Sequence, residues 1–133
     1  MAKSKILVID DEKEFLHLIK EKLELEGYEV ITASDGEEGL ISAQVCEPDL
    51  VICDIKMPKK DGFEVLKELK QHANFRAPFI MLTVVDDFDK IKEAYEYAAD
   101  FYITKPVELY KLSKNIKILL NLSKSKKNTL KNP

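Results

Sequence analysis

The sequence lacks the features that mark secreted, membrane and thiolate-metal proteins. It has only two cysteines, Cys46 and Cys53, and their spacing suits neither a metal site nor dithiol redox chemistry. No apolar run approaches the roughly 18 residues of a membrane helix. Residues 1–5 lead into the first apolar run without the hydrophobic region and cleavage site of a secretory signal. We therefore expect reduced, buried thiols and a cytoplasmic protein that does not bind membranes.

Acidic residues are missing from the C-terminal segment, residues 123–133, which carries four lysines. Removing these four from the 21 basic residues of the chain leaves 17 against 24 acidic residues in residues 1–122. Such an acidic body argues against direct nucleic-acid binding by the domain itself. Length and composition predict one domain over residues 1–122, followed by a Lys-rich tail or the start of a linker over residues 123–133.

Short apolar runs alternate with segments of helical periodicity along the chain. Strands are expected at residues 5–9, 29–33, 49–53, 79–82 and 101–104. Five helices are expected after them: one that ends at Gly27, one at 37–45, one around 63–69, one at 87–98 and one at 108–122. This alternation predicts an α/β fold, a doubly wound, flavodoxin-like parallel sheet with helices on both faces and strand order 2-1-3-4-5.

The apolar residues of two helices predict which side faces the core. In the first helix the expected inward residues are Phe15, Leu18, Ile19 and Leu23, and in the last they are Leu109, Leu112, Ile116 and Leu119. Leu16 and Leu25 fall off the stripe of the first helix. They are candidates for partner contacts, although scattered surface leucines are normal.

Four of the five expected strands end on residues that can handle a metal ion or a phosphoryl group. These residues are Asp10 and Asp11 after the first strand, Asp54 after the third, Thr83 after the fourth and Lys105 after the fifth. Ligands of open α/β sheets bind outside the carboxyl ends of the strands, and the first and third strands are neighbours in the predicted order. We therefore expect one pocket to collect three carboxylates, a hydroxyl and an ammonium group.

Three clustered carboxylates repel one another unless a cation lies among them, and oxygen-only ligands suit Mg²⁺. The pair Asp10-Asp11 alone is equally well explained as a helix cap. Asp54 is harder to explain in that way, because a charge at the end of a buried strand needs a partner. A carboxylate can attack phosphorus, while a metal ion and a lysine neutralise the phosphoryl oxygens. The set predicts magnesium-assisted phosphorylation of an aspartate.

Across residues 4–121 the chain resembles the response-regulator receiver domains of two-component signalling, the CheY-like superfamily. The matching motifs are Asp10-Asp11-Glu12, Gly27-Tyr28, Asp35-Gly36, Asp54-Ile55-Lys56-Met57-Pro58 with Asp61-Gly62, Thr83, and Tyr102-Ile103-Thr104-Lys105-Pro106. Each motif is weak by itself, but the ordered set is specific. The resemblance implies a signalling domain that catalyses only its own phosphotransfer and slow dephosphorylation, with no enzymatic activity on other substrates.

The resemblance implies that Asp54 accepts a phosphoryl group from the histidine of a kinase or of a histidine phosphotransfer protein. It also implies that Asp11, Asp54 and the backbone carbonyl of Lys56 bind Mg²⁺ directly. Asp10 would act mainly through water.

The resemblance further implies that Thr83 and Lys105 contact the phosphoryl group and that the Lys105–Pro106 peptide bond is cis. Tyr102 matches the switch aromatic of the family. Its movement with Thr83 would reshape the face formed by the fourth helix, the fifth strand and the fifth helix, as one charge shifts an existing equilibrium.

Three positions near the site depart from the family or modulate it. Val84 stands where alanine or glycine is usual and could crowd a small phosphodonor. Lys56 and Val85 occupy the variable positions that flank the site, and apolar Val85 cannot orient an attacking water. We therefore expect the phosphoryl group to decay over hours. Phe101 and Asn115 replace a charged pair of one receiver dimer, which weakens the case for that dimer and leaves another weak homodimer open.

Two other classes of function fit less well. An aspartyl-phosphate phosphatase needs Asp-x-Asp, and Lys56 occupies the second acidic position. A flavodoxin-like cofactor binder needs a phosphate-cradling loop after the first strand, where acidic residues would repel phosphate. A receiver cut from a longer regulator or hybrid kinase and a stand-alone receiver both remain open. The kinase, the signal and the output partner are not specified by the sequence.

Overall fold

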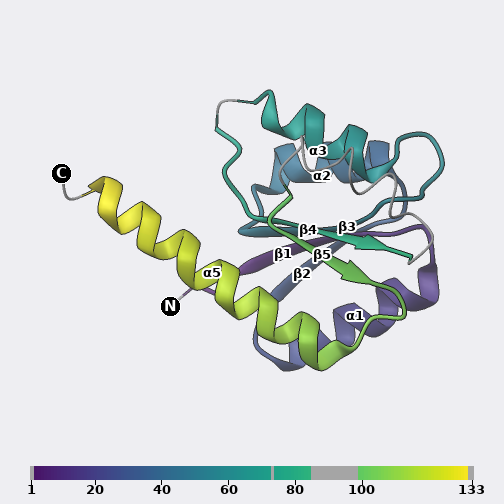
Figure 1. The fold of residues 1–133 in the computed structure, drawn as a ribbon, viewed down its shortest axis with the longest axis horizontal. Helices are drawn as coiled ribbons and strands as arrows, with labels where there is room; N and C mark the ends of the chain where they lie inside the picture. The colour runs from purple at the N-terminus through teal and green to yellow at the C-terminus, as the bar shows by residue number, and fades with distance from the viewer. Residues whose placement is uncertain (1, 73, 85–98, 132–133) are drawn as a thin grey trace.

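The structure, a computed structural model, describes residues 2–72, 74–84 and 99–131. Within these ranges, parallel strands form one five-stranded sheet in the order β2-β1-β3-β4-β5 (Figure 1). The strands are β1 (Lys5–Ile9), β2 (Glu29–Ala33), β3 (Leu50–Asp54), β4 (Phe79–Thr83) and β5 (Phe101–Thr104). The doubly wound fold and the strand order predicted from the sequence are confirmed.

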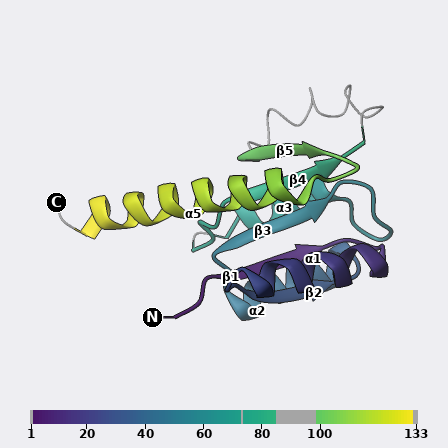
Figure 2. The ribbon, with the colours of Figure 1, turned by 90° about the horizontal axis from the view of Figure 1, so that it is seen from below.

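Helices cover both faces of the sheet (Figures 1 and 2). The helices of the described ranges are α1 (Lys13–Leu25), α2 (Gly36–Cys46), α3 (Gly62–Lys70) and α5 (Leu109–Lys131). α1 and α5 pack on one face, and α2 and α3 pack on the other. The fourth helix, expected at residues 87–98, falls outside the described residues.

Strand residues divide between two hydrophobic clusters because successive side chains point to opposite faces of a sheet. In β1, Ile6 and Val8 join the cluster beneath α1 and α5, whereas Leu7 and Ile9 join the cluster beneath α2 and α3. All four side chains are fully buried. This two-sided burial explains why β1, β3 and β4 read as continuous apolar runs.

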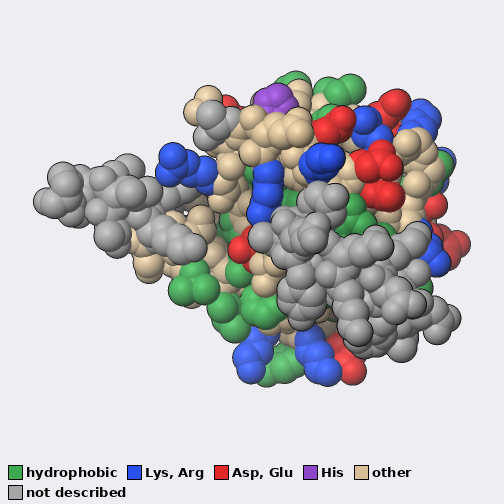
Figure 3. Space-filling model, turned by 45° about the horizontal axis from the view of Figure 1, so that its top comes forward, with side chains coloured by type: hydrophobic (Ala, Val, Ile, Leu, Met, Phe, Trp, Pro, Cys, Tyr) green, Lys and Arg blue, Asp and Glu red, His purple; other side chains and the backbone are tan. Residues whose placement is uncertain are grey.

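The loop between β3 and α3 is fixed to the helices beside it. Asp61 caps α3 by accepting a hydrogen bond from the Glu64 backbone N–H at 2.9 Å. Lys60 forms an ion pair of 2.9 Å with Glu68 of α3, and Lys59 lies 3.5 Å from Asp35, the cap of α2. Side chains of both signs are interspersed on this side of the molecule (Figure 3).

Glycine is required where the chain crosses close behind the end of β3. A Cβ atom added to Gly62 would lie 2.5 Å from the Asp54 carbonyl oxygen and 2.7 Å from Met81 Sδ. Gly62 also donates its backbone N–H to Ile55 O at 2.8 Å. The loop therefore folds back directly against the backbone of Asp54.

The core face of α1 differs from the expected one. Leu16 is buried, whereas Leu18 is 52% exposed. At about 100° per residue, Leu16 lies on the same side of the helix as Ile19 and Leu23, and Leu18 lies outside that arc. The prediction that Leu18 faces inward and Leu16 outward was therefore wrong. The exposure of Leu25 and the core positions expected in α5 are confirmed.

α5 continues as a helix to Lys131, beyond the expected end at residue 122. The sequence offers no glycine or proline between Pro106 and Pro133 to stop it. The far end of α5 extends past the edge of the sheet (Figure 1). Whether residues 123–133 act as a tail or as a linker stays a prediction.

Both cysteines are free; Cys53 is buried as expected, while Cys46 is partly exposed. Among the described helices, none combines the length and the apolar character that a bilayer crossing requires.

Candidate functional site

The polar residues that end the strands meet at one edge of the sheet. Ile9 of β1 pairs with Cys53 of β3, so the residues that follow them, Asp10 and Asp54, come side by side. On the other side of β3, Asp54 pairs with Leu82, the residue before Thr83. The ends of β1, β3 and β4 therefore bring Asp10, Asp54 and Thr83 to the same edge of the sheet.

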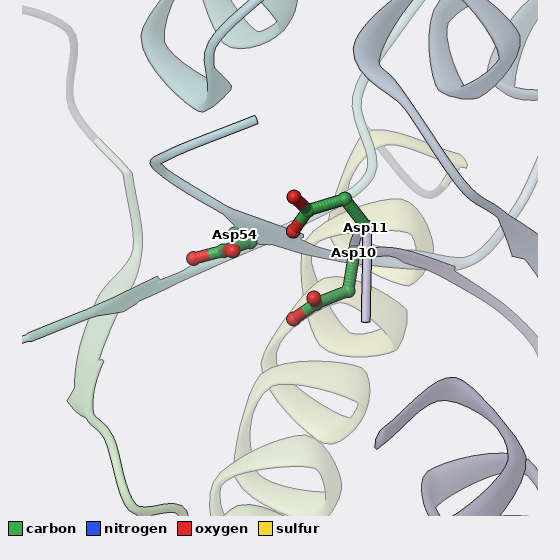
Figure 4. Close-up of side chains that lie close together, drawn as sticks. All are labelled: Asp10, Asp11 and Asp54. Atoms are coloured by element: carbon green, nitrogen blue, oxygen red, sulfur yellow. The ribbon is translucent and has the colours of Figure 1, made fainter. Parts of the chain in front are cut away.

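Three carboxylates form the centre of this site. Oxygens of Asp10, Asp11 and Asp54 lie within 4.8 Å of one another (Figure 4). Asp10 is fully buried and Asp54 is 7% exposed, whereas Asp11 is exposed to solvent. The cluster is thus closed on the sheet side and open at Asp11.

Lys105 neutralises part of this negative charge. Its Nζ lies 3.0 Å from Asp10 Oδ2 and 3.3 Å from Asp54 Oδ2, and its side chain is only 16% exposed. The Nζ atom also lies over the ring of Phe15, 5.1 Å from the ring centroid. The other carboxylate oxygen of Asp10, Oδ1, accepts a hydrogen bond from the Glu12 backbone N–H at 2.9 Å. Both oxygens of the fully buried carboxylate therefore have donors.

The pKa values of the two buried carboxyl groups record the excess of negative charge. Burial, with the neighbouring charge of Asp10, raises the pKa of Asp54 from 3.8 to about 6, against the opposing effect of Lys105. Burial also raises the pKa of Asp10, despite its hydrogen bonds from Glu12 and Lys105. Burial alone would lower the pKa of Lys105, but the hydrogen bond to Asp10 and the charge of Asp54 outweigh it, so this pKa is raised. The positive charge of Lys105 therefore neutralises only part of the negative charge of the three carboxylates.

The donor set fits a hard divalent cation. Carboxylate oxygens with access to water are the ligands that Mg²⁺ prefers, and Asp11 gives that access. A cavity of about 390 Å³ adjoins the cluster and is lined by Asp11, Ile55, Lys56, Met57, Pro58 and Asp61. Lys56, whose carbonyl the family resemblance implies as a ligand, thus borders the same space as Asp11. The residues present fit Mg²⁺.

The remaining predicted residues lie around this centre. Thr83 is buried, and its hydroxyl donates to the Val84 carbonyl at 3.1 Å. Val84 is 37% exposed. Tyr102 is partly buried in β5 against the cluster beneath α2 and α3. The Lys105–Pro106 peptide bond is cis, the form that the resemblance implies. Val85 lies outside the described residues.

Sequence reasoning missed the contact of Phe15 with Lys105. Phe15 was expected to face the core, and it does pack against the cluster beneath α1 and α5. Nothing in the spacing of Phe15 distinguishes an aromatic beside a lysine from an ordinary core residue. Asp61 was noted only as part of a motif, although its place in the loop after Asp54 could have suggested that it lines the cavity.

Comparisons with known proteins agree with this geometry. Residues 6–117 match the family model described as the response regulator receiver domain. The alkaline phosphatase synthesis transcriptional regulatory protein PhoP of Bacillus subtilis (strain 168) is 45% identical over 120 residues, which are 90% of this chain and 49% of that protein. The chain spans about half the length of the curated relatives it matches.

Solved structures share the fold. A CheY-like response regulator receiver domain protein from Methanospirillum hungatei JF-1 superposes with a TM-score of 0.86 at 32% identity, over 94% of this chain and 99% of that one. NtrX from Brucella abortus gives a TM-score of 0.87 at 29% identity, over 99% of this chain and 30% of that one. The second match is to one part of a larger protein.

Proposed function

This chain belongs to the response regulator receiver domain family, and from that premise we propose that Asp54 is the residue that accepts the phosphoryl group. The observation that carries the proposal is its position. Asp54 ends β3 with oxygens of Asp10 and Asp11 within 4.8 Å and the Lys105 ammonium at 3.3 Å. A carboxylate beside an ammonium group, and beside further carboxylates that can hold a metal ion, suits attack on the phosphorus of a group whose oxygens carry negative charge.

In the proposed transfer, a carboxylate oxygen of Asp54 attacks the phosphorus of a phosphohistidine. The new O–P bond forms as the P–N bond breaks, and the electron pair returns to the imidazole nitrogen, which takes up a proton. The donor is the histidine of a kinase or of a histidine phosphotransfer protein. Lys105 then moves from the Asp54 carboxylate to a phosphoryl oxygen, and the Thr83 hydroxyl turns from the Val84 carbonyl to another.

Asp10, Asp11, Asp54 and the carbonyl of Lys56 are the groups that we propose hold Mg²⁺. The ion supplies charge neutralisation between the carboxylates and the phosphoryl oxygens when it is bound. The exposure of Asp11 keeps a path to solvent open, which fits an ion that retains part of its water shell. The buried Asp10 is already held at both oxygens, by Glu12 and Lys105, so it acts through its charge and through water.

We propose that the signal leaves the domain through β5 and α5. Thr83 and Thr104 are paired in β4 and β5, and Lys105 donates its backbone N–H to the Thr83 carbonyl at 2.6 Å. A shift of Thr83 toward the phosphoryl group therefore moves the strand that carries Tyr102. The expected contribution of the fourth helix falls outside the described residues.

The domain context is a further part of the proposal. The named relative from Bacillus subtilis is a transcriptional regulatory protein about twice as long as the matched region. We propose that this receiver controls an attached output region of that kind, with the helical continuation of α5 leading toward it. A stand-alone receiver is the alternative, and the coding sequence beyond residue 133 distinguishes the two. The cytoplasmic location expected from the sequence stays a prediction.

The test is intact-mass measurement after incubation with acetyl phosphate and Mg²⁺. We expect a gain of one phosphoryl group in the wild-type chain and none without Mg²⁺ or in Asp54→Asn. Beryllofluoride, which mimics the phosphoryl group, gives an independent readout by NMR. A chain that neither gains mass nor responds to beryllofluoride would contradict the proposal and indicate a binding module that works without phosphorylation.

A further inference from the structure

Phe15 covers the lysine of the site with the face of its ring. From this contact we infer that Phe15 is a positioning residue for Lys105, holding the ammonium group where the phosphoryl oxygens arrive. The inference rests on the proposed function and adds to it a residue of α1 that has no polar group.

The lysine needs such a support because its side chain is long and flexible. An ammonium on a four-carbon stem has three donors and no fixed direction. Nζ reaches Asp10 Oδ2 at 3.0 Å and Asp54 Oδ2 at 3.3 Å. One of these two partners, Asp54, is the group whose charge and shape change on phosphorylation. The ring, 5.1 Å from Nζ to its centroid, is a partner that does not change.

Phe15 is itself held firmly. It lies in the first turn of α1, and its ring packs against the buried cluster beneath α1 and α5. Glu12, at the start of the same helix, donates its backbone N–H to Asp10 Oδ1 at 2.9 Å. The beginning of α1 therefore fixes two partners of Lys105 together, the Asp10 carboxylate through Glu12 and the aromatic ring directly.

The environment makes the ring contact effective. Attraction between a cation and the negative face of an aromatic ring strengthens when water is excluded. The Lys105 side chain is only 16% exposed. Phe15→Leu would keep most of the apolar contact with the core but would present no ring face to Lys105. This variant therefore distinguishes the effect of the ring–ammonium contact from the effect of apolar packing.

The experiment compares Phe15→Leu and Phe15→Tyr with the wild-type chain. Phe75→Leu is the matched control, because Phe75 is also a partly buried phenylalanine but packs against the cluster on the other face of the sheet. Two readouts are taken. The first is the ¹H shift of the Lys105 Cε protons in metal-free protein, which the ring moves upfield. The second is the rate of phosphorylation by acetyl phosphate at saturating Mg²⁺, together with the apparent Mg²⁺ affinity.

We expect Phe15→Leu to lose the upfield shift and to slow phosphorylation about three- to tenfold, with unchanged Mg²⁺ affinity. Phe15→Tyr should retain both properties, and Phe75→Leu should leave both as in the wild type. A wild-type rate and an unchanged Lys105 shift in Phe15→Leu would overturn the inference while the proposed function stands. Equal slowing in Phe75→Leu would also overturn it, since it would assign the effect to general loss of packing. A wild-type chain that is not phosphorylated at all would overturn the proposed function instead, and the metal-free shift still reports on Phe15.

Discussion

Lys105 donates a hydrogen bond of 3.0 Å to Asp10, and this contact joins the end of the last strand to the end of the first. Asp10 is fully buried, and a buried carboxylate is stable in its charged form only with a partner. The same ammonium reaches Asp54 at 3.3 Å. Lys105 therefore contributes both to the stability of the fold and to the charge balance of the site. A mutation that breaks its contact with Asp10 should change both.

Replacing Lys105 by glutamine should destabilise the metal-free protein by about 3 kcal/mol at neutral pH, because it leaves Asp10 and Asp54 without their buried cation. The same change should tighten Mg²⁺ binding and slow phosphorylation. Urea unfolding without Mg²⁺ gives the loss of stability, and the same measurement with Mg²⁺ gives the change in Mg²⁺ binding. Lys111→Gln is the matched control, since its ion pair with Glu108 is largely exposed and contributes little. Equal stability of the two variants would contradict this account.

The raised pKa of Asp54 predicts a specific pH dependence. Between 3.8 and about 6 the folded protein binds more protons at this group than the unfolded chain does, so its contribution to stability falls as pH rises through this range. A difference of about 2 pKa units corresponds to about 3 kcal/mol at neutral pH. Metal-free Asp54→Asn should therefore be more stable than the wild type by up to that amount at pH 8, and the advantage should shrink as the pH falls from about 6 to about 4 and be absent below that.

Urea unfolding of the wild type and of Asp54→Asn over this pH range measures their difference in the free energy of unfolding. The other titratable groups are present in both proteins, so the pH dependence of this difference reports on Asp54. Addition of Mg²⁺ should reduce the advantage of the variant at pH 8. A difference in stability that does not vary with pH would mean that the Asp54 carboxyl group ionises normally.

The sequence predicted the position of the site well because that position follows from topology alone. Asp54 and Thr83 end β3 and β4, Asp10 and Lys105 follow β1 and β5, and the carboxyl ends of parallel strands lie at the same edge of a sheet. The sequence could not predict that Lys105 bridges Asp10 and Asp54, since the direction of a flexible side chain depends on the final packing. The ring of Phe15 beside Lys105 was beyond prediction for the same reason.

The errors along the helices have a different origin. Helical spacing places Leu16 on the same side of α1 as Ile19 and Leu23, and Leu18 outside that arc, so the expected core stripe included the wrong leucine. α5 has no stop signal after Leu122, and its lysines are good helix formers, so charge composition was a poor guide to its end. Local composition predicts which segments are apolar better than it predicts where a helix ends.

Mg²⁺ should stabilise the wild-type fold, because the ion binds a charge cluster that the unfolded chain does not form. At a concentration one hundred times its dissociation constant, the gain should be about 2.7 kcal/mol. Asp11→Asn should lose most of this gain at little cost to the metal-free fold, since Asp11 is exposed. Thermal unfolding over a Mg²⁺ titration measures both effects, and Ca²⁺ and K⁺ test selectivity. Full retention of the Mg²⁺ effect in Asp11→Asn would argue against Asp11 as a ligand.

Gly62→Ala should destabilise the protein far more than Gly27→Ala. The added Cβ at Gly62 would lie 2.5 Å from the Asp54 carbonyl oxygen, so the backbone behind the site must move. Gly27 has a φ of 98° but open space around it, so its substitution costs only the strain of that conformation, about 1–3 kcal/mol. The free energies of unfolding of Gly62→Ala and Gly27→Ala measure this difference. Gly62→Ala should in addition weaken Mg²⁺ binding. Equal losses would mean that the loop accommodates a methyl group freely.

Val84 stands where the receiver family usually has alanine or glycine, and we expect that its replacement speeds phosphorylation by small donors. Val84 is 37% exposed, and its carbonyl holds the Thr83 hydroxyl at 3.1 Å. Val84→Ala removes two methyl groups beside the expected phosphoryl position and keeps the backbone carbonyl. The rate with acetyl phosphate should rise several-fold, while Mg²⁺ affinity and stability stay close to the wild type, because a half-exposed side chain contributes little to the core. Val84→Thr, which keeps the branched shape, is the control and should leave the rate unchanged; an equal gain in both variants would show that shape does not set the rate.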